Sequence, residues 1–194
     1  MITKKQWAKL LKKWDGKVYQ RPNERVIQRL KWFSKKAKLL KGLNVLEIGC
    51  NAGLMAVDAN KYVNMYIGSE RKEEYYQQAL VTKKSCKLEK CTFIKAGFFD
   101  AGVFAFENFD NSDTAIILSR VLYHLWDKDV KLVLEYLYAC NIAIVICGTK
   151  GKGRTHNDYD FAKPENVTKF FKSVGMDFKI DYKHERFFCG VATR

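Results

Sequence analysis

The chain has 194 residues, is 47% hydrophobic and carries a net charge of +14 at pH 7. This length suits one domain with a substantial core. The longest apolar run, residues 142–147, is far too short to span a membrane, and no secretory signal is visible in residues 1–14. Six scattered cysteines are typical of reduced thiols, which predicts a cytoplasmic protein.

The positive charge is concentrated at the N-terminus. Residues 1–41 hold 14 Lys and Arg against Asp15 and Glu24, a net of +12, whereas residues 42–194 have a net of +2. Within the first part, residues 3–14 predict a short helix with an apolar stripe, and Asn23 caps a second helix that runs to Leu40 before Gly42. We therefore expect a basic, amphipathic helical extension over 1–41 and a separate domain over 42–194.

Strands and helices alternate in the second part. We expect strands at 44–49, 65–69, 91–95, 113–119 and 142–148, helices at 54–60, 71–84, 128–140 and 164–174, and a hairpin of 178–182 and 186–192. Residues 151–160 read as a polar loop. This alternation predicts an α/β fold, in which a mostly parallel sheet is covered by helices on both faces.

A glycine turn follows the first strand of this domain. It has the form Glu47-x-Gly49-x-Asn51-x-Gly53, and Glu70 ends the next strand. Ligands of parallel sheets bind at the carboxyl ends of the strands, where glycine allows close approach and a carboxylate can accept ribose hydroxyls. Asn51 replaces a glycine, but asparagine enters the left-handed region more readily than other residues. The pattern predicts a nucleoside site.

The acid, the GCNAG turn and Glu70 together resemble motif I of the class I S-adenosylmethionine (SAM) methyltransferases. The resemblance implies a Rossmann-like three-layer α/β/α sandwich, with a seven-stranded sheet in the order 3-2-1-4-5-7-6 and an antiparallel last strand. It implies SAM as cofactor and S-adenosylhomocysteine (SAH) as product. Glu47 would orient the turn and meet the methionine ammonium, unless it is a purely structural carboxylate. Glu70 would accept both ribose hydroxyls, unless it only supplies charge to the helix that follows.

Further cofactor contacts follow from the same resemblance. Backbone groups of Gly49, Cys50 and Asn51 would line the methionine and ribose, with Gly53 completing the turn and Ser119 ending the fourth strand. The third strand departs from the family, because glycine stands at position 97 where an acid usually reads the adenine amino group. Backbone groups of Gly97 and Phe98 would then contact adenine, and the ring of Phe98 or Phe99 either stacks on it or belongs to the core.

The segment after the fourth strand resembles the part of the family that lies beside the transferred methyl group. It offers Arg120 for an anionic group, with Tyr123 and His124 as further catalytic candidates. Histidine has the right intrinsic pKa for a general base, although a packed core histidine is the equal alternative. Tyr19 and Arg21 are candidates for a lid over the substrate.

Several acceptor-specific motifs are missing. No Asn/Asp-Pro-Pro-Tyr/Phe or Pro-Cys pair follows the fourth strand, and no histidine completes a metal site around Cys86 and Cys91, so no metal is expected. The sequence therefore contains no motif that identifies the acceptor.

The basic extension weakly favours RNA or another polyanion as the acceptor. Its lysines and arginines can face phosphates, and Trp32, which falls off the predicted apolar stripe, is a candidate stacking platform. The alternative is a pair of helices that pack their aromatic residues and leave solvated lysines outside. A small anionic metabolite or sugar then becomes the acceptor, and a SAM-binding module without transferase activity is a third interpretation.

Overall fold

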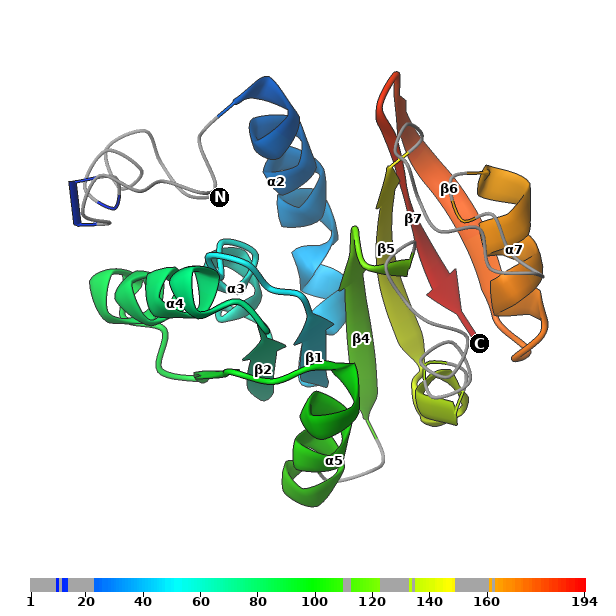
Figure 1. Cartoon of the computed structure of the whole chain (residues 1–194). Coiled ribbons are helices and arrows are strands. Elements are labelled where there is room, and N and C mark those ends of the chain that lie inside the picture. Colours follow the sequence, from blue (N-terminus) through cyan, green and yellow to red (C-terminus); the bar gives the residue numbers. More distant parts are fainter. Residues whose placement is uncertain are drawn as a thin grey trace. The chain divides into compact units, whose positions relative to one another are not determined.

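A computed structural model describes residues 10, 12–13, 23–109, 113–122, 133, 135–148, 161 and 163–194. Its seven strands form one sheet in the order β3-β2-β1-β4-β5-β7-β6. Figure 1 shows β1 beside β2, and β7 between β5 and β6. Neighbours among β1, β2 and β3 are parallel, as are β4 and β5, and β7 is antiparallel to both β5 and β6. The predicted α/β fold and strand order are therefore confirmed. The chain divides into two compact units, residues 1–109 and 110–194, which are described in turn.

The first unit alternates helices with parallel strands. Its elements are α2 (Glu24–Lys36), the 3₁₀ turn η1 (Ala37–Leu40), β1 (Asn44–Ile48), α3 (Ala56–Ala59), β2 (Met65–Ser69), α4 (Glu73–Cys86), β3 (Cys91–Ile94) and α5 (Phe98–Asn108). Every residue of β1 is buried, as expected for a strand covered on both faces. The strands agree with the predicted ones to within one residue, whereas α3 is shorter than predicted.

The predicted cap of α2 is confirmed, because the Asn23 side chain accepts a hydrogen bond from the Val26 N–H at 3.1 Å. The prediction for Trp32 was wrong, since its side chain is only 5% exposed and lies beside the fully buried Phe33. Consecutive helical residues point about 100° apart, so burying both rings makes the buried face of α2 wider than the predicted stripe. Trp32 therefore presents little surface for base stacking.

Helix α5 was not predicted from the sequence. It buries only small residues, Ala101, Gly102 and Ala105, while Phe99 and Phe106 are 59% and 65% exposed. Because large apolar side chains lie on the exposed side, the segment lacks the usual amphipathic pattern of a surface helix.

The second unit contains β4 (Thr114–Ser119), β5 (Ile142–Gly148), α7 (Pro164–Lys172), β6 (Asp177–His184) and β7 (Phe187–Thr193). Residues 135–139 are also helical, within the helix predicted at 128–140. The terminal hairpin is confirmed and is longer than predicted. Phe171 of α7 packs against Phe178 of β6 with the ring centroids 5.2 Å apart, which joins helix and hairpin.

Only Leu10, Lys12 and Lys13 of the helix predicted at 3–14 are described; they are helical, and Leu10 is buried as expected. The predicted loop at 151–160 lies outside the described residues. In the described part of the chain, no helix combines the length and the apolar character needed to cross a membrane. All six cysteines are free, and five of them are buried.

Candidate cofactor site

The turn after β1 is built on left-handed backbone conformations. Gly49, Asn51 and Gly53 have φ angles of 67°, 55° and 68°. Asn51 therefore adopts the conformation that the sequence predicts for it, and its side-chain oxygen accepts the Ala52 N–H at 3.1 Å. The Gly53 N–H donates to the Cys50 carbonyl at 2.9 Å, which closes the turn. These two hydrogen bonds stabilise the turn.

The Phe93 ring fills the space beside two glycines of this region. A Cβ atom at Gly53 would lie 2.6 Å from this ring, and one at Gly68 of β2 would lie 2.7 Å from it. Both distances are shorter than any real contact of that kind, so both positions need glycine for packing reasons. One buried ring thus joins the turn after β1 to the middle of β2 and to β3, a relation that the sequence pattern did not indicate.

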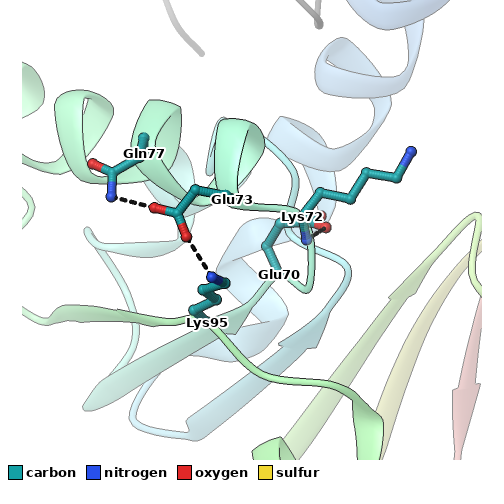
Figure 2. Close-up of polar contacts among 5 residues, drawn as sticks. All are labelled: Glu70, Lys72, Glu73, Gln77 and Lys95. Carbon is teal, nitrogen blue, oxygen red and sulfur yellow. Dashed lines mark hydrogen bonds and ion pairs between the residues drawn. The ribbon is translucent and has the colours of Figure 1, made fainter.

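Glu70 ties the end of β2 to the same turn. Its carboxylate accepts the Asn51 N–H at 3.1 Å and the Lys72 N–H at 2.9 Å, the second of which is drawn in Figure 2. Its own N–H donates to the Ile94 carbonyl of β3 at 3.1 Å, and the residue is 8% exposed. A carboxylate has about four acceptor positions, so these two bonds orient it and leave capacity for hydroxyl donors.

Glu47, on strand β1 just before the glycine turn, is a buried carboxyl group. Its side chain is bonded to the Tyr66 hydroxyl, which donates to the carboxylate, rather than to an amide of the turn. Burial raises the pKa of Glu47 to about 7; the Tyr66 bond opposes this shift, the charge of Glu70 adds to it, and Arg29 also opposes it. A carboxyl group in this state would gain from a ligand cation such as an ammonium.

We expect this buried acid to make stability depend on pH. Because the folded-state pKa of Glu47 is raised from 4.5 to about 7, the folded protein binds more protons than the unfolded chain between these two pH values. Its stability therefore falls as pH rises from 4.5 to 7 and levels off above 7. The free energy of unfolding should drop by up to about 3 kcal/mol relative to Glu47→Gln. Urea titrations of both proteins between pH 5 and 8 measure this difference, and a constant difference would contradict the expectation.

At the end of β3, an ion pair lies near the position where the resembling family carries an acid. Lys95 contacts the Glu73 carboxylate at 2.6 Å, and Gln77 donates to the same carboxylate at 2.7 Å (Figure 2). Gly97 precedes the first turn of α5 without a side-chain cap, and Phe98 is half-buried. Gly97 and Phe98 thus follow β3 at its carboxyl end, as the predicted adenine contacts require; the contacts themselves stay a prediction.

In the second unit, Ser119 ends β4, and Arg120 follows with a φ angle of 61°. Its N–H donates to the Ile146 carbonyl at 2.7 Å. A left-handed arginine costs about 1–2 kcal/mol and is typical of functional positions. Nothing in the residue pattern predicted this left-handed conformation. Tyr123 and His124, like Tyr19 and Arg21, lie outside the described residues.

No protein-family model matches the chain, and no curated protein matches it in sequence. Among the described residues, no group of His, Cys, Asp or Glu is arranged to hold a metal ion. Solved structures nevertheless match its fold.

A complex of DhpI with SAH has 16% identity and a TM-score of 0.65, covering 97% of this chain and 92% of the other. Magnesium protoporphyrin IX methyltransferase of Synechocystis PCC 6803, with bound SAM, has 13% identity and a TM-score of 0.62, covering 98% and 90%. A Streptococcus pneumoniae protein described as a candidate tRNA methyltransferase has 15% identity and a TM-score of 0.59, covering 85% and 68%. The chain therefore has the Rossmann-like fold of the SAM-dependent methyltransferases.

Proposed function

We propose that this protein is a SAM-dependent methyltransferase. The observation that carries the proposal is the position of Glu70, whose carboxylate is held at the carboxyl end of β2 by N–H groups of Asn51 and Lys72. A buried carboxylate beside a glycine turn suits the two hydroxyls of a ribose. The matching fold of proteins solved with SAM or SAH supports the same cofactor here.

Each cofactor contact has a proposed role. Glu70 accepts the ribose hydroxyls, Glu47 attracts the methionine ammonium, and backbone groups from Gly49 to Asn51 line the cofactor. Ser119 is a further proposed cofactor contact, and Gly97 and Phe98 are the proposed adenine contacts. The cofactor supplies a methyl group on a sulfonium, which is already activated for in-line displacement.

The remaining work of the protein is to place the acceptor and to remove its proton where the chemistry requires it. Arg120 holds an anionic part of the acceptor, and Tyr123 and His124 are the proposed groups for proton removal. Tyr19 and Arg21 are further proposed substrate contacts. Of the three acceptor-side candidates, Arg120 has the support of a strained conformation.

For the acceptor we favour RNA or another polyanion, because residues 1–41 carry a net charge of +12. A small anionic metabolite or sugar is the second candidate. Proteins of this fold include both a candidate tRNA methyltransferase and a protoporphyrin methyltransferase, so the fold suits either kind of acceptor.

The test is transfer of a radiolabelled methyl group from SAM into a cell extract that is then separated into nucleic acid, protein and small molecules. Label in nucleic acid, lost when residues 1–21 are deleted, supports a polyanionic acceptor; label only in small molecules supports the second candidate. Calorimetry with SAH is run in parallel. SAH binding without label in any fraction indicates a SAM-binding module without transferase activity, and absence of SAH binding overturns the proposal.

A further inference from the structure

A pocket lined by lysines lies at the opposite edge of the parallel strands from the glycine turn. It has a volume of about 550 Å³ and is lined by Lys41, Gly42, Lys61, Tyr62, Val63, Asn64 and Lys90. Lys41 and Gly42 precede β1, residues 61–64 precede β2, and Lys90 precedes β3. Since these three strands are parallel neighbours, the pocket lies at their amino ends, whereas the glycine turn and Glu70 lie at their carboxyl ends.

The lysines of this pocket are partly held in place by the protein. The Lys90 ammonium donates to the Val63 carbonyl at 2.8 Å, and the Lys61 ammonium contacts Asp58 at 3.2 Å. An ammonium has three donors, so each keeps capacity for an anion. Lys41 is exposed, and Glu89, although it precedes Lys90, does not line the pocket. The pocket therefore presents three ammonium groups, of which that of Lys61 is paired with Asp58, and has no acid among its lining residues.

The basic character continues from the pocket along the chain before β1. Lys38 on η1 and Lys35 in the last turn of α2 are both exposed. Lysines spread over a surface act as point charges that suit a phosphate backbone without reading its sequence. We propose that Lys41, Lys61 and Lys90, which we call the amino-edge lysines, bind backbone phosphates of RNA.

The distance between the pocket and the proposed cofactor site indicates how large an acceptor must be to reach both. A strand of five residues is about 15 Å long, so an anion in the pocket is at least that far from a cofactor at the carboxyl edge. A small acceptor beside the methyl group does not reach the amino-edge lysines, whereas a nucleic acid chain does. This inference depends on the proposed methyltransferase activity in one respect, which is that the bound RNA is taken to be the acceptor of the methyl group.

The test measures binding of a fluorescein-labelled single-stranded RNA to the full chain by polarisation at several salt concentrations. The variant Lys41→Gln/Lys61→Gln/Lys90→Gln should bind the RNA about tenfold or more weakly. The negative slope of log K against log[salt] should become shallower by about 2, as expected for three lost phosphate contacts. The corresponding triple arginine variant keeps the charge and should retain binding.

The matched control is Lys169→Gln/Lys172→Gln/Lys183→Gln, which removes three exposed lysines of the second unit and changes the net charge equally. Equal RNA affinity of the two glutamine variants, or no RNA binding by the unmodified protein at low salt, overturns the inference. Displacement of RNA by micromolar pyrophosphate also overturns it, because a small-anion site would then explain the pocket. SAH calorimetry on the same proteins reports the cofactor site separately and shows whether each variant is folded.

Discussion

The change Glu70→Gln should weaken SAH binding by about 10- to 100-fold, because a hydrogen bond to a charged group contributes about 1.5–3 kcal/mol. The carboxylate accepts one N–H from the glycine turn and one from the start of the α4 segment. Glutamine has a single acceptor oxygen, so its amide nitrogen would face one of these donors and turn the group away from a ribose. Isothermal calorimetry with SAH measures the affinity.

Glu73→Gln is the matched control for this prediction. Glu73 lies three residues further along, undergoes the same change in charge and shape, and forms an exposed ion pair with Lys95 (Figure 2). Its carboxylate is not bonded to the turn, and exposed pairs contribute little to stability. We expect its SAH affinity to stay within about twofold of the unmodified protein. Equal losses in both variants would show that the charge of this region matters and the Glu70 bonds do not.

The change Gly53→Ala should lower the free energy of unfolding by about 2–5 kcal/mol. A left-handed alanine costs about 1–2 kcal/mol, and the contact of its Cβ with the Phe93 ring adds about 1–3 kcal/mol. The ring is 5% exposed, so neighbouring side chains limit how far it can move. Urea denaturation of the variant measures the loss, and SAH binding should weaken with it because the turn changes shape.

Gly42→Ala separates the two contributions. Gly42 has a similar φ angle of 77°, but nothing lies within 4 Å of the Cβ it would gain. This variant should therefore show only the conformational cost, about 1 kcal/mol after the smaller entropy of the unfolded alanine chain is included. If the two variants lose the same stability, the Phe93 contact is unimportant.

The sheet was predictable because buried parallel strands are short apolar runs between breakers. The strand at 142–148 is an example of such an apolar run. The left-handed conformation of Asn51 in the turn after the first strand was predictable because asparagine adopts positive φ more readily than most residues. The position of Glu70 after β2 followed from the general location of ligands in parallel sheets.

The features that could not be predicted from the sequence depend on contacts between residues far apart in the chain. Helix α5 buries only small side chains, so periodicity of large apolar residues does not mark it. Trp32 is buried through tertiary packing, which overrides its position on an ideal helical stripe. The pairing of Glu47 with Tyr66 joins residues 19 positions apart, and no local rule selects that partner.

The contact of one phenylalanine ring with two glycines has a consequence for related sequences. Gly53, Gly68 and Phe93 occupy one shared volume, so a change at one position alters what the other two tolerate. Where a relative carries a smaller residue in place of the ring, alanine at position 68 loses its two shortest contacts and keeps only a tight one, 3.1 Å from the Cβ of Cys50. Position 53 still needs a residue that adopts positive φ. These three positions should therefore vary together across homologues, with the glycine of the turn the slowest of them to change.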